Sequence, residues 1–367
     1  MDILWISGRT LGLDLAGTTE IGIFEAINRK NENQVTIISP GKKKEWGRNH
    51  IPIKKINIPG LITISGSIMI RLKLKKILNE CKYDAIMVDW RYVRLMRNLL
   101  KNTEIPWFII DRGPPMKQNW RLRFQKYLWK KSWEIANIHA SAGIIVSKKH
   151  NEFIKKYANT YIDTIIVNSG TSFPYGEIKS LRENNVVEII YIGQIDKRRD
   201  IQSIFKLKEH LDKALIKNRI RIIGEGDARK DLTKRALEID GLEVLGRKNE
   251  KEIKLILSKS HVGILPMPDA PIWQMASTIK LVEYARNGLI TVGPKHAGNS
   301  WGENPDWEFL SENKKWWIEA TTTIKELILS GLWENFSKSA IYDSKERSWD
   351  KISDKMILEM RDNMAKI

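Results

Sequence analysis

The sequence is poor in the residues that disulfide and metal chemistry require. Its 367 residues include one cysteine, Cys81, which excludes an internal disulfide and a cysteine-based metal site. The six histidines show no metal-ligand spacing, and no clear Asp-x-Asp motif is present. We therefore expect no metal and no cofactor, and a lone cysteine is typical of a reducing compartment.

Export signals and membrane-spanning segments are missing as well. No basic N-terminal region leads into a long apolar stretch with a cleavage site, so we expect no signal peptide. The longest uncharged run, residues 56–70, contains Pro59, Gly60 and Gly66 and is too short to span a bilayer. These absences predict a cytoplasmic protein, free or held peripherally on the inner face of the plasma membrane.

The glycine fingerprint of dinucleotide-binding enzymes is also absent. The loop after the first expected strand contains Gly8, Gly12 and Gly17, which are not spaced as G-x-G-x-x-G. The sequence therefore gives little support to a dehydrogenase.

Positive charge is abundant and unevenly distributed. The formal net charge is +18, and residues 1–175 hold 29 Lys+Arg against 14 Asp+Glu, a net of +15. Such a field attracts polyanions, which include acidic lipid headgroups, lipid-linked phosphates and nucleic acid.

Apolar runs alternate with helical segments along both halves of the chain. This order is typical of parallel α/β sheets, and it predicts two doubly wound, Rossmann-like domains. Residues 177–185 are charged and lack an apolar period, so we interpret them as the linker. The predicted parts are an N-terminal domain, a C-terminal domain and a final helix, at residues 1–178, 186–340 and 341–367.

One segment, residues 264–294, reads as strand, loop, helix and strand. Ser277 or Thr278 is a plausible N-cap of a helix over Ile279–Arg286, which Asn287-Gly288 ends. Lys280 and Glu283 lie three residues apart and share a helix face. Free amides, a cation and a carboxylate suit a nucleotide diphosphate and its ribose. The alternative is a surface helix with an ordinary ion pair.

Residues Thr278–Gly288 resemble the sugar-nucleotide motif of GT-B glycosyltransferases, and the chain as a whole is similar to the family 4 group. The resemblance implies two domains that face a cleft, with Lys280 at the donor phosphate and Glu283 at the donor ribose. Many retaining members carry a second glutamate where Met275 stands here. This departure leaves retention or inversion open.

Further positions extend the resemblance through the second half of the chain. In this chain the first strand of the second half ends at Gly193. In GT-B enzymes the loop after the corresponding strand carries basic residues that meet the donor diphosphate. The resemblance implies that role for Lys197 or Arg198. The alternative is a solvated charge run. The turn Gly224-Glu225-Gly226 resembles a turn close to the nucleotide, although glycines also simply terminate strands.

Two acidic residues follow expected strands in the first half. Asp89 and Asp111 each stand at the carboxyl end of a strand, where open α/β sheets place ligands. An inverting enzyme needs a base for the acceptor hydroxyl, and we rank Asp111 first and Asp89 second. The alternative is that each carboxylate caps the segment that follows.

The helix expected around residues 117–133 carries two apolar stripes. One stripe can pack on the sheet, and the other would lie exposed beside basic residues, as at a membrane interface. The alternative is a helix buried on both sides. The residues expected on a membrane or acceptor face are Trp120, Arg123, Lys126, Trp129 and Lys130.

The sequence thus predicts a glycosyltransferase that moves a sugar from a nucleotide-diphosphate donor to a lipid-linked acceptor or a growing cell-envelope glycan at an anionic membrane. The final segment, residues 347–350, resembles the one that crosses back to the first domain. A GT-B nucleotide-sugar 2-epimerase is the main alternative, and an epimer formed from the nucleotide sugar alone would reveal it. A basic nucleic-acid-binding protein is the weaker alternative, and no nucleic-acid partner is expected.

Overall fold

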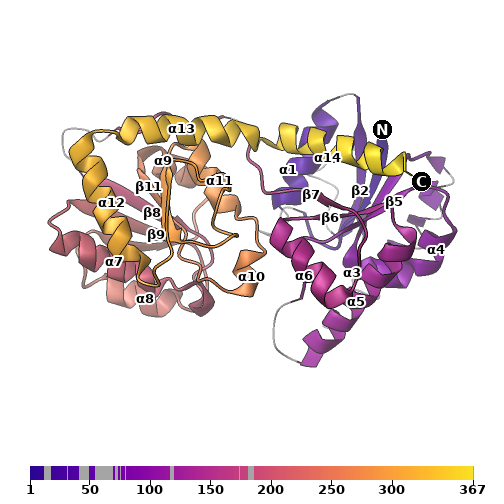
Figure 1. Cartoon of the computed structure of the whole chain (residues 1–367), viewed down its shortest axis with the longest axis horizontal. Helices are drawn as coiled ribbons and strands as arrows, with labels where there is room; N and C mark the ends of the chain where they lie inside the picture. Colours follow the sequence, from indigo (N-terminus) through magenta and orange to yellow (C-terminus); the bar gives the residue numbers. More distant parts are fainter. Residues whose placement is uncertain are drawn as a thin grey trace. The chain divides into compact units, whose positions relative to one another are not determined.

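The computed structural model describes residues 1–11, 18–30, 32–40, 49–53, 69–70, 73–74, 76–78, 80–115, 120–172, 174–180 and 186–366. The chain divides into two compact units, one made of Met1–Gly170 with Trp349–Ile367 and the other of Thr171–Ser348 (Figure 1). The division falls before the expected linker, whose residues 181–185 lie outside the described part.

The first unit contains a seven-stranded parallel sheet in the order β3-β2-β1-β4-β5-β6-β7. Its strands are β1 Asp2–Ile6, β2 Gln34–Pro40, β3 His50–Ile53, β4 Ala85–Asp89, β5 Trp107–Ile110, β6 Ala142–Ile145 and β7 Thr164–Ile166. Its helices are α1 Thr18–Arg29, α3 Trp90–Val93, η3 Arg94–Met96, α4 Arg97–Asn102, α5 Trp120–His139, α6 Lys148–Ala158 and α14 Trp349–Met364.

Continuous apolar runs explain the centre of this sheet. Every residue of β4, β5 and β6 is buried, as expected for parallel strands that helices cover on both faces. The C-terminal helix α14 completes the unit because Trp349 fills space that glycines leave. A Cβ at Gly22 or Gly170 would lie within 2.3 or 2.6 Å of the Trp349 ring. Arg29 adds an ion pair to Asp350 at 3.2 Å.

The second unit contains a six-stranded parallel sheet in the order β10-β9-β8-β11-β12-β13. Its strands are β8 Val187–Ile192, β9 Asn218–Ile223, β10 Leu242–Gly246, β11 Val262–Ile264, β12 Ile290–Pro294 and β13 Glu308–Ser311. Its helices are η4 Lys197–Arg199, α7 Gln202–Lys213, α8 Arg229–Ala236, α9 Glu250–Lys259, α10 Pro271–Gln274, α11 Ile279–Arg286, α12 Trp316–Ser330 and α13 Trp333–Glu346.

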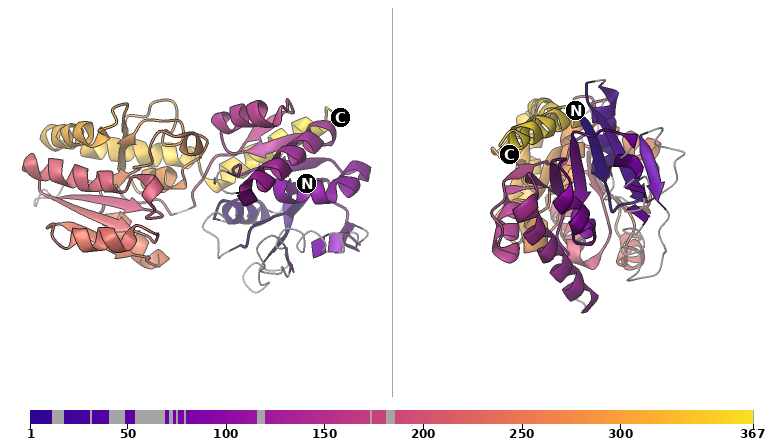
Figure 2. Two further views of the ribbon diagram at one scale, coloured as in Figure 1. Left: turned by 90° about the horizontal axis from the view of Figure 1, so that it is seen from below. Right: turned by 90° about the vertical axis from the view of Figure 1, so that its right-hand side faces the viewer.

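Helices cover both faces of each sheet (Figures 1 and 2). In the second unit α7 packs against α12, and α11 packs against α13, so these two pairs belong to different layers. The predicted doubly wound parallel architecture is therefore confirmed for both units.

Several elements differ from the expectations. The sequence did not predict the edge strands β3 and β13 or the short helices α3, α4 and α10. The expected final helix over residues 341–367 is the end of α13 in the second unit followed by α14 in the first. Among the described residues, no helix is both long and apolar enough to cross a membrane.

Candidate functional site

The second unit has a topological switch point between β8 and β11. These strands are neighbours, yet β9 and β10 lie on one side and β12 and β13 on the other. The loops that follow β8 and β11 therefore diverge from the carboxyl edge of the sheet, where open α/β sheets bind ligands. One loop begins at Gly193, and the other leads to α11.

Helix α11 begins after Thr278, but not with the side-chain cap that we expected. The Thr278 hydroxyl donates to the carbonyl oxygen of Gly298 at 2.5 Å, and no side chain caps the helix. Asn299 fixes the same loop by donating to the carbonyl oxygens of Leu265 and Pro294 at 3.1 and 3.0 Å. The Leu281 amide donates to the Thr278 carbonyl at 3.1 Å, so the amides of Ile279 and Lys280 are those available to a ligand in the first turn of α11.

Lys280 and Glu283 share one face of α11, as predicted, and form a close ion pair with each other. Their side chains are 27% and 25% exposed, so both reach the surface. The hydroxyl of Tyr284 anchors the helix to the sheet because it accepts from the backbone N–H of Ile192 at 3.0 Å. A ligand anion at Lys280 and hydroxyls at Glu283 would replace the mutual ion pair.

The loops that follow β8 and β9 contain glycines that allow their backbones to pack closely together. A Cβ at Gly224, whose φ is +149°, would lie 1.7 Å from the carbonyl oxygen of Gly193. A Cβ at Gly226 would lie 2.2 Å from the carbonyl oxygen of Ile195, whose N–H donates to the Glu225 carbonyl at 2.8 Å. Gly193 and Gly224 therefore hold two loops together at the carboxyl edge, and only glycine fits at Gly224.

Glu225 extends this packing to the next strand. Its carboxylate accepts from the N–H of Arg247 at 3.1 Å and pairs with Arg229 at 2.9 Å. The side chain is 51% exposed, so Glu225 both ties the turn to the end of β10 and remains accessible.

The three basic residues after β8 form the single helical turn η4, so their side chains extend in different directions. Asp196 caps this turn by accepting from Arg198 N–H at 3.0 Å. Arg199, which the sequence analysis did not select, lies over the Trp273 ring of α10 at 4.8 Å. Lys197 lines a separate cavity beside α7 and α8. The sequence has three consecutive basic residues here, Lys197, Arg198 and Arg199. Only their order in the turn η4 determines which side chain faces Trp273 and which lines the cavity.

In the first unit, the structure contradicts Asp111 as the general base. Asp111 is fully buried, and its carboxylate accepts from the indoles of Trp129 and Trp133 at 2.6 and 3.0 Å and from Gly113 N–H at 2.9 Å. Burial favours a higher pKa, but His150 at 3.4 Å and these hydrogen bonds lower the pKa of Asp111 to about 2. A buried, fully engaged and weakly basic carboxylate is structural.

Asp89 occupies the carboxyl end of β4, beside the switch point of the first sheet between β1 and β4. It caps α3 by accepting from Arg91 N–H at 2.9 Å, as the alternative interpretation expected, and pairs with the Arg91 guanidinium at 2.6 Å. A Cβ at Gly8 would lie 3.0 Å from the carboxylate, so the loop after β1 packs on Asp89.

The sequence analysis missed a buried glutamate at the same edge. Glu20 lies in the first turn of α1, accepts from the Ser7 hydroxyl and faces Arg9 at 3.5 Å. Burial raises the pKa of Glu20 from 4.5 to about 7, although Ser7 and Arg9 oppose that rise. Arg112 is half-buried here, and desolvation lowers its pKa to about 10. No sequence pattern separates Glu20 from an ordinary first-turn acid.

Helix α5 shows which of its apolar stripes is buried. Trp129 is fully buried, so the prediction that it lies on an exposed face was wrong. Its indole N–H donates to the buried Asp111 carboxylate. Arg123, Lys126 and Lys130 are exposed as expected, beside Phe124 at 58% exposure. The side chain of Trp120 lies outside the described residues.

Within the described part of the chain, no group of three or more His, Cys, Asp and Glu side chains is placed to hold a metal ion. The groups that the second unit offers to an anionic ligand and its hydroxyls are the backbone amides of α11 with Lys280, Arg199 and Glu283.

Comparison with known proteins identifies the fold. No protein-family model matches the chain, and no curated protein matches it in sequence. Sucrose-phosphate synthase from Thermosynechococcus elongatus is similar in structure, with a TM-score of 0.73 at 12% identity and 100% of both chains covered. HepE from Anabaena in complex with UDP gives a TM-score of 0.68 at 14% identity, again over 100% of both chains.

WaaG, a glycosyltransferase involved in lipopolysaccharide biosynthesis, gives a TM-score of 0.67 at 12% identity, covering 96% of this chain and 98% of WaaG. At such identities the likeness shows the fold alone. The chain has the GT-B fold of these proteins, as the resemblance in residues Thr278–Gly288 implied.

Proposed function

We propose that the protein is a glycosyltransferase that uses a nucleotide-diphosphate sugar as donor. The observation that carries the proposal is α11, which presents uncapped amides, Lys280 and Glu283 at the switch point of the second sheet. The shared GT-B fold and the UDP held by HepE support a nucleotide donor. Few other ligands require a diphosphate site and a ribose site on one helix turn.

The chemistry follows from the charges of these groups. The first-turn amides of α11 and the ammonium of Lys280 stabilise the negative charge that develops on the leaving diphosphate. Glu283 accepts hydrogen bonds from the ribose hydroxyls, and Arg199, held over Trp273, adds a second cation. This arrangement needs no metal, because protein cations and amides supply the positive charge.

The first unit is proposed to bind the acceptor. With Asp111 fully engaged, Asp89 is the carboxylate proposed as base if the reaction inverts the anomeric centre, and Arg91 holds it in place. We propose that the acceptor of this enzyme in the cell is a lipid-linked glycan or a growing envelope glycan.

A basic aromatic face of α5 and α6 supports a membrane location for that acceptor. Lys126 lies over the Tyr157 ring at 5.0 Å, and Arg94 lies over the Tyr127 ring at 5.0 Å. Phe124 adds an exposed apolar ring. Cations beside exposed aromatic rings suit an anionic bilayer surface, so we place the enzyme peripherally on the cytoplasmic face of the membrane.

The test measures thermal stabilisation of the full chain by UDP-, GDP-, TDP- and ADP-sugars. One donor is expected to raise the melting temperature, and the variants Lys280→Ala and Glu283→Ala are expected to lose that response. The matched control is Lys206→Ala, because Lys206 and Glu209 form an ion pair of the same spacing on α7.

Product analysis then separates transfer from epimerisation. Release of nucleotide with sugar attached to an acceptor supports the proposal, whereas an epimer formed from the donor alone supports the epimerase. Stabilisation that persists in both α11 variants would show that the donor binds elsewhere and would remove the basis of the proposal.

A further inference from the structure

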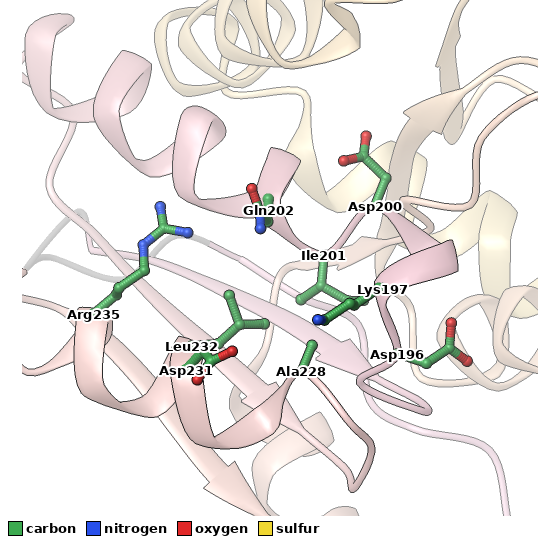
Figure 3. A pocket seen from close by; sticks show the side chains of 9 residues that line it. All are labelled: Asp196, Lys197, Asp200, Ile201, Gln202, Ala228, Asp231, Leu232 and Arg235. Atoms are coloured by element: carbon green, nitrogen blue, oxygen red, sulfur yellow. The ribbon is translucent and has the colours of Figure 1, made fainter.

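A cavity of about 340 Å³ lies in the second unit, where η4 and the starts of α7 and α8 meet (Figure 3). Small-molecule sites range from roughly 300 to 1,000 Å³, so this volume suits a small ligand. None of its lining residues comes from α10 or α11, although η4, which contributes Lys197 to the lining, also carries Arg199 of the proposed donor site. The lining residues are Asp196, Lys197, Asp200, Ile201, Gln202, Ala228, Asp231, Leu232 and Arg235.

The floor of the cavity is apolar, and its walls are charged. Ile201, Ala228 and Leu232 are buried and form the floor. In Figure 3 the ammonium of Lys197 points toward the middle of the space, and Arg235 stands on the opposite side. The aliphatic stem and guanidinium of Arg235 are supported by Phe205, whose ring lies 4.5 Å away.

The charges of this cavity are only partly compensated. Asp196 is committed to Arg199 at 3.4 Å and to the N–H of Arg198, and it turns outward in Figure 3, as does Asp200. Within the described part of the chain, Lys197, Asp231 and Arg235 form no ion pair. Two cations without an ion pair to any described residue therefore face the space, together with the Asp231 carboxylate and the amide of Gln202.

We propose that this cavity binds a small phosphorylated polyol, such as a sugar phosphate, at a site separate from the donor site. Lys197 and Arg235 supply the charge for the phosphate, which charged donors bind more strongly than neutral ones. Asp231 and Gln202 accept from the hydroxyls of the polyol, and the apolar floor contacts its carbon skeleton. The proposal gives Lys197 a role other than the donor-diphosphate contact that the resemblance implied for Lys197 or Arg198.

The proposal does not need the glycosyltransferase assignment, because its phosphate-binding groups, Lys197 and Arg235, lie on η4 and α8 and not on α11. The site would let the level of a phosphorylated sugar be sensed by the same unit that holds the nucleotide sugar. Such a ligand is the kind of compound from which nucleotide sugars are made by nucleotidyl transfer.

Isothermal titration of the full chain with ribose 5-phosphate tests the site. We expect saturable binding with one equivalent, and binding weakened by at least about tenfold in Lys197→Ala and in Arg235→Ala. Ribose serves as the uncharged probe and is expected not to bind. The matched control variant is Lys234→Ala, which removes an exposed cation of α8 that does not line the cavity.

Three outcomes would overturn the proposal. The first is no binding of ribose 5-phosphate at millimolar concentration to the folded wild type. The second is inorganic phosphate binding as tightly as ribose 5-phosphate, which would show an anion site with no role for the polyol. The third is binding that is lost in Lys280→Ala but kept in Lys197→Ala, which would place the ligand in the donor site. Retention of nucleotide-sugar binding in Lys197→Ala, with loss of ribose 5-phosphate binding, supports two sites.

Discussion

The two units place charge at the carboxyl edges of their sheets in opposite ways. In the first unit Glu20 and Asp111 are buried and Arg112 is half-buried, and these side chains are engaged with other protein groups. In the second unit Lys280 and Glu283 are about one quarter exposed on a helix that glycine-rich loops hold in place. The same doubly wound topology thus engages charged side chains within the protein at one edge and leaves them partly exposed at the other.

The largest expected effect comes from Asp111→Asn in the first unit. The amide nitrogen would face an N–H donor, and the indoles of Trp129 and Trp133 or the N–H of Gly113 would lose their buried ionised acceptor, so we expect the first unit to lose about 3–5 kcal/mol of stability. Urea unfolding followed by tryptophan fluorescence measures this loss. The control is Glu312→Gln, whose carboxylate is 81% exposed and whose ion pair should contribute less than about 1 kcal/mol. Equal stability of wild type and Asp111→Asn would mean that the buried network contributes nothing.

Gly224→Ala tests the backbone packing that organises the second edge. The new Cβ would lie 1.7 Å from the Gly193 carbonyl oxygen at a φ of +149°, so we expect a loss of at least about 3 kcal/mol. Gly331→Ala is the matched control, because Gly331 has a φ of +65° with no neighbouring atom within 4 Å. That variant should lose only about 1 kcal/mol. Similar losses in both variants would attribute the effect to backbone conformation instead of packing.

The pH dependence of stability should reveal one desolvated acid in each unit, the buried Glu20 and the half-buried Glu308. Burial raises the pKa of Glu20 and of Glu308 from 4.5 to about 7, so the folded chain binds more protons than the unfolded chain between these values. The contribution of these two groups to stability therefore falls as pH rises from about 4.5 to 7, by up to about 3 kcal/mol for each group. The histidines His50, His261 and His296, whose pKa values burial lowers, oppose that fall.

Urea unfolding at several pH values checks this slope. Glu20→Gln should flatten it for the first unit, and Glu308→Gln should flatten it for the second. The Asp111 carboxyl, whose pKa is lowered to about 2, contributes only below about pH 4 and does not interfere. A slope that survives both substitutions would assign the titration to other groups.

The smallest effect on stability, within about 0.5 kcal/mol, is expected for exposed apolar residues. Phe124→Ser in the first unit should nevertheless weaken sedimentation with phosphatidylserine-containing vesicles about tenfold, because its ring no longer enters the interface. Leu215→Ser in the second unit, where Leu215 is 91% exposed, should leave vesicle binding unchanged. Equal behaviour of the two variants would argue that neither unit has a dedicated membrane face.

Local signals predicted helix α11 well and the buried charge network poorly. The bounds of α11, Ile279–Arg286, agree with the prediction because its apolar spacing and the following Asn287-Gly288 lie within a few residues of one another. The surroundings of Asp111 depend on Trp129, Trp133 and His150, which lie 18 to 39 positions further along the chain. No local pattern reports such contacts.

Short elements and single turns were equally difficult to predict. The strands β3 and β13 have four residues each and lie at sheet edges, where the apolar pattern is weak. Arg199 differs from Lys197 and Arg198 only by its register in one turn, which is fixed when Asp196 caps η4. The part of the candidate site that lies on helix α11 was therefore predicted. The parts that depend on tertiary contacts, such as the position of Arg199, were not.

The chain passes between the two units twice, at Thr171 and at Ser348, and this determines how the units can be separated into fragments. Thr171 forms a parallel bridge with Ser348, and its N–H donates to the Arg347 carbonyl at 2.9 Å, so the outgoing and returning segments run together. The second unit is one uninterrupted stretch of chain that can be excised as a single fragment. A fragment ending at Gly170 would instead lack the indole of Trp349, and a synthetic peptide of residues 349–367 would be needed to restore it by complementation.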